Sequence, residues 1–475
     1  MPFPKTHGRL LAGLSLLACG SAQAGDTPSM EELHRIILQQ QQQLEEQQRQ
    51  IEELRRLVGA GTTAKPDKAR KDVREPRHTS EPTASLAARG QPGQAAKKPA
   101  SEPEEKVEVR MKNGLRVRSA DGDFALRLGG RLHTDAAWYD SDVRQFGDGA
   151  EIRRARIELS GRLFRDWGFR TAYDFADDEV NITDAYLSYR GFKPATIKLG
   201  QFQEPFSLEE LTSSNDVTFM ERALPNALVP GYHLGGGVSG YGDFGRMAWS
   251  GATGLFGEPV GTRSSDQVDD GWGVAGRFAL APVHAKERTL HFGASLEYRE
   301  PNGDNVVSYR TSPETHVANI SLVNTGDIAD VRHTLTYGLE GAWVMGPFSL
   351  QGEYIGTDLQ RDGLSDLRFD GWYGYGSWFL TGESRPYDSR RGVFRRIKPK
   401  HKYGAWELAL RYSTLDLTDR DIEGGKERNL TVGLNWYPNQ NLRFMANYIR
   451  VDTDPSRDGV SDDPDLFQIR GQVRF

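Results

Sequence analysis

Apolar and polar side chains alternate along the run Leu290-His-Phe-Gly-Ala-Ser-Leu-Glu-Tyr-Arg299. Successive side chains of a β-strand point to opposite faces, so this run has one apolar face and one polar face. The same alternation recurs in 124–138, 154–163, 406–412 and 467–475. Long apolar rows paired with charges along a whole chain are typical of a membrane barrel, whose outer face meets lipid and whose inner face meets water.

Sixteen such runs follow residue 106. They begin near residues 124, 151, 168, 180, 195, 234, 246, 271, 289, 333, 347, 368, 404, 429, 441 and 466. An even number is what a closed bacterial barrel requires, and aromatic residues at the ends of the apolar rows match its interfacial girdles. We therefore predict an all-β transmembrane barrel of 16 antiparallel strands over 106–475, surrounded by outer-membrane lipid. The 52 Gly and the hydrophobic fraction of 37% agree with many Gly-punctuated strands.

Two connections depart from the expected alternation of short periplasmic turns and longer extracellular loops. The third long loop, Gln203–His233, carries its own apolar residues and prolines, so we expect it to fold back into the barrel and narrow the pore. The segment 381–403 should be a short turn, yet it has 23 residues rich in Arg and Lys. It is either a solvated basic loop that holds lipid or another partner, or a segment that adds positive charge to the lumen.

The charge and the motif content exclude several function classes. A net charge of -6 is compatible with a cationic pore, because acids collect in predicted outer loops such as 177–179 and 416–423. The single Cys excludes an intrachain disulfide and a Cys-based metal site. There is no Gly-x-Ser-x-Gly, P-loop or His-Glu-x-x-His motif, and the ten His are scattered. We expect no enzyme, no cofactor and no nucleic-acid partner.

The first 24 residues are predicted to be a signal peptide. Basic residues precede the apolar run Leu10–Ala18, and Ala22-Gln-Ala24 offers a small-residue cleavage site. Cys19 belongs to this segment as a small apolar residue. The remainder would be exported to the outer membrane of a Gram-negative bacterium.

Residues 25–105 divide into a heptad repeat and a polar segment. In 25–59, apolar residues recur every seven positions, at Met30, Ile37, Leu44, Ile51 and Val58. This spacing predicts a periplasmic coiled coil, which would suit a trimer; a lone amphipathic helix on the barrel is the alternative. Residues 60–105 are rich in Pro, Ala, Lys and Glu, which predicts a flexible, disordered linker.

Several strings carry a family resemblance. They are Ile152-Arg-Arg-Ala-Arg-Ile-Glu-Leu-Ser-Gly161, Ile182-Thr-Asp-Ala-Tyr-Leu187, Gly200-Gln-Phe-Gln-Glu-Pro-Phe-Ser-Leu-Glu-Glu-Leu-Thr-Ser-Ser214, Phe219-Met-Glu-Arg-Ala-Leu-Pro225 and Thr381-Gly-Glu-Ser-Arg-Pro-Tyr387. With them the chain resembles the phosphate- and polyphosphate-selective porins of Gram-negative bacteria over essentially all of 106–475. The resemblance implies a homotrimer of 16-stranded barrels, with the third loop, the fifth loop and a long periplasmic turn narrowing each pore.

The resemblance also implies an anion site. It would consist of Arg153, Arg154, Asp184, Ser213, Ser214 and Arg222. The lumen-facing parity adds basic residues, and the basic turn adds three more; together they are Arg127, Arg131, Arg156, Arg162, Arg170, Lys198, Arg395, Arg396 and Lys398. Arg suits phosphate because its planar fork donates two hydrogen bonds. The alternatives are structural: Arg on a barrel wall often pairs with an acid across strands, and the two Ser could simply form a turn.

Three positions depart from the expected patterns. The strand alternation predicts that Arg153 faces outward, toward lipid. Either a bulge therefore intervenes or the residue lies at the rim of the barrel. Glu210 stands where some family members have Lys, and Arg156 stands where an aromatic residue is usual. We expect the choice between orthophosphate and a longer chain to be made at these two departures.

The sequence as a whole predicts an anion-selective outer-membrane porin for the passive uptake of phosphate or polyphosphate. Several basic sites in series would each hold an ion weakly and pass it on, whereas one deep site would trap it. Two alternatives stay open. The first is a porin for another anion or for general solutes, and the second is an envelope tether in which the coiled coil is the working part.

Overall fold

The described part of the chain begins at the predicted barrel. A computed structural model describes residues 107–475, apart from 112, 142, 144–145, 262–268, 319, 456–458 and 460. The predicted signal peptide, coiled coil and linker, residues 1–105, lie outside the described residues. Within the described ranges, no helix is both long and apolar enough to cross a membrane.

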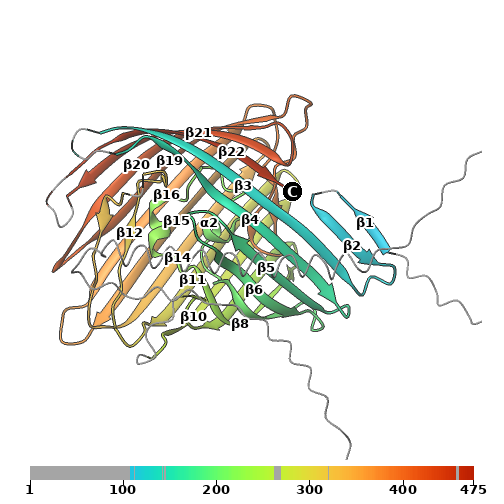
Figure 1. The fold of residues 1–475 in the computed structure, drawn as a ribbon, viewed down its shortest axis with the longest axis horizontal. Coiled ribbons are helices and arrows are strands. Elements are labelled where there is room, and N and C mark those ends of the chain that lie inside the picture. The colour runs from blue at the N-terminus through green and yellow to red at the C-terminus, as the bar shows by residue number, and fades with distance from the viewer. Residues whose placement is uncertain are drawn as a thin grey trace, which may run out of the picture. The chain divides into compact units, whose positions relative to one another are not determined.

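Sixteen long strands in the described ranges form the wall (Figure 1). They are β3 (Ala125–Asp140), β4 (Gly149–Leu163), β5 (Trp167–Asp174), β6 (Asn181–Tyr189), β7 (Thr196–Gln203), β8 (Tyr232–Phe244), β9 (Met247–Phe256), β10 (Trp272–Ala285), β11 (Arg288–Glu300), β14 (Val331–Met345), β15 (Phe348–Arg361), β16 (Leu367–Phe379), β19 (Ala405–Asp419), β20 (Ile422–Tyr437), β21 (Leu442–Asp454) and β22 (Asp465–Arg474). Each pairs antiparallel with the next. Strand β22 pairs back with β3, from Asp465↔Asp140 to Arg474↔Arg131, so the barrel is closed. The predicted barrel of 16 antiparallel strands is confirmed.

The predicted strand starts agree with the structure except at β20. This strand begins at Ile422 rather than near residue 429, because the acidic segment 416–423 is not a loop. It forms the tip of the β19–β20 hairpin, where Asp419 pairs with Ile422 and Lys426 Nζ lies 2.7 Å from Asp416 Oδ2. Leu415 and Leu417 of the same hairpin are buried against the inner loops, so this part of β19 has one apolar face and one polar face.

Burial alternates along the strands with polar residues inside. In β22, Gln468 and Arg470 are buried, whereas Phe467 and Ile469 are 45% and 40% exposed. The buried side chains face the lumen and the exposed apolar ones face outward, which is the arrangement of a wall with lipid outside. Stacked aromatic pairs stand among the outward residues, including Trp406–Trp436 at 5.6 Å between ring centroids.

A short hairpin precedes the barrel and was not predicted. It consists of β1 (Val107–Arg110) and β2 (Leu115–Ser119). Strand β22 covers β3 only from Arg131 onward, and β2 pairs with the uncovered segment 125–128 of the same strand. The hairpin therefore satisfies backbone groups that would form an open edge at this end of the barrel.

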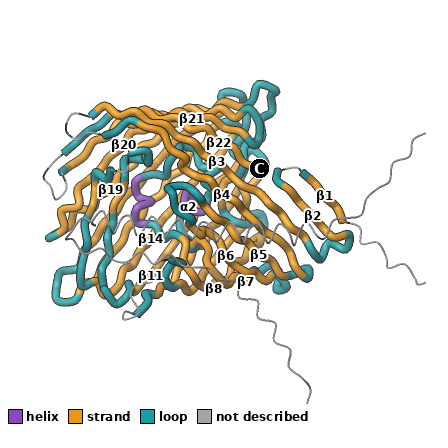
Figure 2. Tube along the Cα trace, viewed as in Figure 1, coloured by secondary structure: helices purple, strands orange, loops and turns teal. Residues whose placement is uncertain are grey.

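The third loop, residues 204–231, lies against the inner face of the wall. It contains α2 (Leu208–Leu211) and the 3-10 helix η1 (Leu224–Leu228), the purple segments of Figure 2. Ser207 caps α2 by accepting a hydrogen bond from Glu210 N at 3.1 Å. Glu353 of β15 accepts from the backbone N–H groups of Leu208 and Glu209, at 2.9 and 2.7 Å. A carboxylate on the wall thus satisfies two amides that the helix itself leaves without partners.

The third loop packs against a group of apolar residues on the inner wall, called the apolar bed below. Ile355 and Leu359 of β15 and Phe369 of β16 are buried and pack with Leu224 and Leu228 of the loop. Burying a Leu or Phe side chain is worth about 1.5–3 kcal/mol. These inward apolar residues interrupt the polar character of the inner face, and they explain why the loop folds inward at this side of the barrel.

The fifth loop, residues 301–330, meets the third loop inside the barrel. It contains the short pair β12 (Arg310–Thr311) and β13 (Val323–Asn324). Its buried Glu314 lies 2.5 Å from Arg411 Nη2 and accepts a hydrogen bond from Thr431 at 2.7 Å. Arg411 also lies 3.7 Å from Glu209 of the third loop. One arginine of β19 thereby holds both loops against the same part of the wall.

The basic turn 380–404 also contacts the inner wall. It contains β17 (Tyr387–Asp388) and β18 (Val393–Phe394). Arg277 of β10 donates to the carbonyl of Gly392 at 2.7 Å, and Tyr387 lies 2.6 Å from Nδ1 of His291. Both wall residues are buried on the inward face, so the turn occupies the lumen rather than forming a solvated loop.

Candidate functional site

One side of the lumen remains open as a cavity of about 1220 Å³. Its lining comes from the β1–β2 hairpin, from strands β3 to β8, from the third loop and from the basic turn, with further residues from the β10–β11 and β20–β21 turns and from the end of β22. Among the described residues, fifteen Arg or Lys and six Asp or Glu line it. The cavity therefore carries a formal excess of nine positive charges, although the whole chain has a net charge of -6.

The structure brings most of the predicted site residues to this cavity. Of the implied anion site, Arg154, Asp184, Ser213, Ser214 and Arg222 line it. Of the additional basic residues, the lining includes Arg127, Arg131, Arg156, Arg170, Lys198, Arg395, Arg396 and Lys398. Arg153 and Arg162 are not among the lining residues; Arg162 Nη1 donates to the carbonyl of Gly122 at 3.3 Å.

Five further basic residues line the cavity without having been singled out. They are Arg116, Lys286, Arg391, Lys400 and Arg474. Arg474 lies on the polar parity of the last run, and Arg391 and Lys400 belong to the basic turn, so their sequence positions did carry a signal. Arg116 belongs to the β1–β2 hairpin, which the alternation pattern did not reveal.

A bulge explains the double-arginine motif. Ile152 pairs with Thr134 and Arg154 pairs with His133, so Arg153 is the extra residue between two adjacent pairs. Arg153 Nε and Nη2 donate to Glu221 of the third loop at 3.0 and 3.1 Å. Two explanations were left open for Arg153, a bulge or a place at the rim of the barrel. The structure shows the bulge.

Three arginines surround Glu221. Besides Arg153, Arg470 Nη2 donates to its carboxylate at 2.6 Å, and Arg154 Nη1 lies 3.7 Å from it. Burial alone would raise the pKa of Glu221, but the charges of Arg153, Arg154 and Arg470 outweigh it and hold the pKa well below 4.5. The carboxylate is therefore ionised at neutral pH and leaves a positive excess around it.

Two arginines of the lining are paired with acids on neighbouring strands. Arg156 donates twice to Asp174 Oδ2, at 3.2 and 2.9 Å, and the two residues are direct register partners. Arg170 lies 2.9 Å from Asp184 and 3.2 Å from Glu158. Structural pairing, the alternative to anion contact, is thus present for these two arginines, which still line the cavity.

The third loop adds a cation and two hydroxyl groups. Arg131 Nη1 donates to Ser214 Oγ at 2.8 Å, so the serines face a wall arginine. Arg222 lies 3.0 Å from Glu210 Oε2 and donates to the carbonyl of Glu210 at 2.9 Å. Arg222 therefore neutralises the carboxylate that departs from the family pattern.

Other cations keep free donors. Arg127 Nε and Arg154 Nη1 are buried and make no hydrogen bond to any described residue. Lys198 Nζ lies between two rings, 5.0 Å from the centroid of Tyr186 and 5.1 Å from that of Phe202. Burial, followed by repulsion from Arg474, lowers the pKa of Arg396 to about 10, so it stays charged at neutral pH. These cations are available to an incoming anion.

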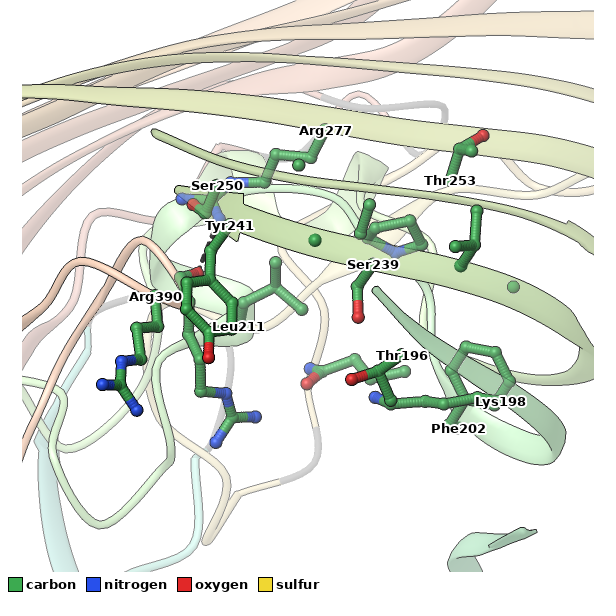
Figure 3. Close-up of a pocket in the computed structure, with 18 of the residues that line it drawn as sticks. Thr196, Lys198, Phe202, Leu211, Ser239, Tyr241, Ser250, Thr253, Arg277 and Arg390 are labelled. Carbon is green, nitrogen blue, oxygen red and sulfur yellow. Dashed lines mark hydrogen bonds between the residues drawn. The ribbon is translucent and has the colours of Figure 1, made fainter. Parts of the chain in front are cut away.

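A side pocket of about 150 Å³ adjoins the cavity between the basic turn and β7 to β9 (Figure 3). Arg390 lies over the Tyr241 ring at 5.2 Å, and Lys198 is shared with the main cavity. Arg277 also lines it, but it is bound to Glu340 and to turn carbonyls. The pocket therefore extends the positive surface beside the turn.

Comparison with known proteins assigns the barrel to a family. The family described as phosphate-selective porin O and P matches residues 126–475. The chain belongs to this family. The porin is 31% identical to Porin O of Pseudomonas aeruginosa over 412 residues, covering 78% of this chain and 92% of that protein. It is also 31% identical over 402 residues to an uncharacterised Caulobacter vibrioides protein, covering 80% and 78%.

Two solved barrels are also similar in structure. The anion-selective porin from Comamonas acidovorans has a TM-score of 0.46 at 15% identity, over 74% of this porin and 100% of that chain. The outer membrane channel DcaP of Acinetobacter baumannii has a TM-score of 0.46 at 13% identity, over 75% and 99%. Family membership, rather than these distant likenesses, places the porin in the outer membrane as a channel.

Proposed function

We propose that this porin is anion-selective and lets phosphate or polyphosphate diffuse passively into the periplasm. The observation that carries the proposal is the cavity lined by fifteen Arg or Lys against six Asp or Glu among the described residues. A fixed positive excess in a narrow, poorly hydrated passage attracts anions and repels cations. The description of the family supports the same class of substrate.

The cations would act in series. On β3 and β4 the register places Arg154 toward the end with the third and fifth loops, and Arg127 toward the end with the basic turn. Arg395, Arg396 and Lys398 then follow from the turn itself. An anion would meet free donors one or two at a time and leave each as the next becomes available, which permits flow without a deep trap.

The third loop would set the width of the passage. It brings Ser213, Ser214 and Arg222 opposite Arg131 and Arg154 of the wall, all on the same cavity. With Glu210 held by Arg222, the loop presents hydroxyl groups and an arginine there rather than a free carboxylate. A chain of several phosphates could contact successive cations together, so the same lining would suit polyphosphate.

The porin would assemble as a homotrimer, with residues 25–59 as a periplasmic coiled coil joined to the barrel by 60–105. The seven-residue repeat of 30–58 supports this arrangement, since a short heptad repeat forms a stable helix by self-association. Mass measurement of the intact chain in detergent tests it. Three chains per particle are expected, and a monomer with intact barrel and heptad would contradict it.

Single-channel recording in a planar bilayer tests the substrate class. The reversal potential under a KCl gradient should show anion selectivity, and phosphate, pyrophosphate or sulfate is then titrated against the chloride current. Block by phosphate or pyrophosphate at or below about 1 mM, which corresponds to about 4 kcal/mol of binding, is the expected result. Cation selectivity overturns the proposal. Equal block by sulfate would identify a porin for anions in general.

A further inference from the structure

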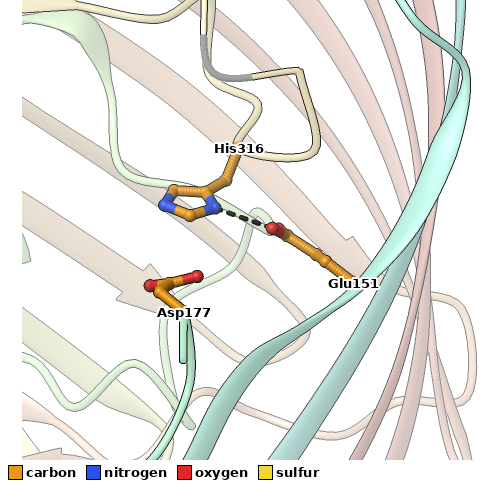
Figure 4. Close-up of side chains that lie close together, drawn as sticks. All are labelled: Glu151, Asp177 and His316. Carbon is orange, nitrogen blue, oxygen red and sulfur yellow. Dashed lines mark hydrogen bonds and ion pairs between the residues drawn. The ribbon is translucent and has the colours of Figure 1, made fainter. Parts of the chain in front are cut away.

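Three metal-ligating side chains converge outside the cation-lined cavity (Figure 4). Glu151 comes from β4, Asp177 from the connection between β5 and β6, and His316 from the fifth loop. The ligand atoms of all three lie within 4.8 Å of one another. His316 Nδ1 is 2.9 Å from Glu151 Oε2, and the Asp177 carboxylate lies beside the imidazole.

The donor set matches a divalent transition-metal ion. Two carboxylates and a neutral imidazole carry a formal charge of about -2, which a divalent cation balances. Ligands at about 2.0–2.1 Å from a tetrahedral ion are roughly 3.3 Å apart, close to the observed separation of Nδ1 and Oε2. Imidazole favours Zn²⁺, Cu²⁺, Ni²⁺ and Co²⁺ over Mg²⁺ and Ca²⁺, which prefer oxygen ligands only.

A second observation at the same place points to a ligand. Glu151 Oε1 is buried and accepts no hydrogen bond from any residue that the structure describes. Among those residues, His316 alone forms an ion pair with Glu151. A buried carboxylate oxygen without a partner is costly, and a bound cation would remove that cost.

The site would join segments that are far apart in the sequence. Glu151 lies on the inward face, paired with the buried Asp135, and stands three residues before Arg154 of the cavity lining. His316 lies in the fifth loop, two residues after Glu314, which bonds Arg411 and Thr431. A metal held here would fasten the fifth loop to β4 at the mouth of the passage.

We propose that Glu151, Asp177 and His316 bind one divalent ion of the Zn²⁺ class per chain. Exposed Asp177 moves toward the ion, while Glu151 and His316 are already within ligand distance of each other. The bound ion replaces the single hydrogen bond between Glu151 and His316 by three metal–ligand bonds. The fifth loop is therefore held more firmly with metal than without it.

The test is metal titration of the full-length porin, purified in detergent without a histidine tag and stripped with a chelator. Calorimetry should show one Zn²⁺ site per chain and at least about tenfold weaker binding of Mg²⁺ and Ca²⁺. Co²⁺ should give a visible absorption band that reports nitrogen and oxygen ligands. Hydrogen exchange in peptides around residue 316 should slow when Zn²⁺ is added.

The variants His316→Gln and Asp177→Asn should each lower the Zn²⁺ affinity by at least about tenfold. His284→Gln, which changes an exposed histidine near the end of β10, should leave it unchanged. No stoichiometric Zn²⁺ binding, or unaltered binding by His316→Gln, overturns the proposal. Each variant is first shown to unfold like the wild type, and no readout depends on conductance, so the result is independent of the proposed transport.

Discussion

At the scale of single residues, the cations of the passage fall into two classes. Arg156 and Arg170 have an acid of the wall within 2.9 Å, whereas among the described residues Arg127 forms no ion pair and Arg154 Nη1 lies 3.7 Å from its nearest carboxylate, Glu221. A hydrogen bond from a charged donor to an anion stabilises by about 1.5–3 kcal/mol. The free donors should therefore contribute more to anion binding than the paired ones.

Replacing Arg154 by Ala should weaken block of the chloride current by phosphate. Loss of one charged hydrogen bond, about 1.5–3 kcal/mol, corresponds to a roughly tenfold to hundredfold higher blocking concentration. Arg162→Ala is the matched control, because Arg162 lies on the same strand but does not line the cavity. Equal effects of the two substitutions would show that Arg154 makes no direct contact with the anion.

Replacing Glu221 by Gln should destabilise the porin at neutral pH, because the common counter-charge of Arg153, Arg154 and Arg470 is lost. Removing one partner of a buried pair costs about 3 kcal/mol, here the lower end of the usual range since Glu221 is partly exposed. The folded-state pKa of Glu221 is depressed, so its contribution exists above the unfolded pKa and is lost as the pH falls through the folded value.

The difference in unfolding free energy between wild type and Glu221→Gln should thus be present at pH 7 and shrink as the pH falls well below 4.5. Urea titration in lipid vesicles at several pH values measures it. Glu423→Gln, at the exposed tip of the β19–β20 hairpin, should change little. A difference that does not depend on pH would mean that the charge of Glu221 is not what stabilises the loop.

At the scale of elements, the third loop depends on Glu353 of the wall. This carboxylate accepts from two backbone N–H groups at the start of α2. In Glu353→Gln only one amide oxygen remains as an acceptor, so one of the two hydrogen bonds is lost, and the backbone N–H left without a partner costs about 1–3 kcal/mol. Hydrogen exchange in peptides covering 204–214 should become faster, while peptides of β15 stay protected; unchanged exchange in 204–214 would show that the apolar contacts alone hold the loop.

The basic turn depends on Gly392. Its φ is +62°, and a Cβ there would lie 2.8 Å from Ser250 Oγ and 3.1 Å from the Cβ of Ala279. Gly392→Ala should push the turn away from the wall, raise the conductance and weaken phosphate block. Gly382→Ala is the control, because φ is +82° but no atom lies within 4 Å of the added Cβ. If both variants behave alike, the close approach to Ser250 does not hold the turn.

At the scale of the whole molecule, transport and assembly should be separable. The cavity lining lies entirely within the described barrel and its hairpin, residues 113 to 475. Deletion of residues 25–105 should therefore leave the single-channel conductance and the phosphate block unchanged. Loss of an envelope phenotype with an intact channel would instead favour a tether, and loss of conductance would show that the N-terminal segment is needed for the pore.

The barrel could be predicted from the amino-acid sequence, because strand alternation is a local property with a period of two. Each run, such as 290–299, indicates which side chains face lipid and which face water. The number of runs, sixteen, equals the number of strands in the wall. The same parity identified Arg127, Arg131, Arg154 and Arg170 as inward residues, and the apolar content of 203–233 indicated an inward loop. These features do not require knowledge of a distant partner.

The contacts of each inward residue could not be predicted from the alternation pattern and are known from the folded structure. The bulge at Arg153 depends on the register with β3, the apolar bed depends on β15 and β16 facing the third loop, and Arg411 joins two loops. The entry of the basic turn depends on Arg277 and His291, more than ninety residues away in the chain. Such contacts involve residues far apart in the sequence, so the alternation pattern cannot specify them; in this porin they separate the paired arginines from the free ones.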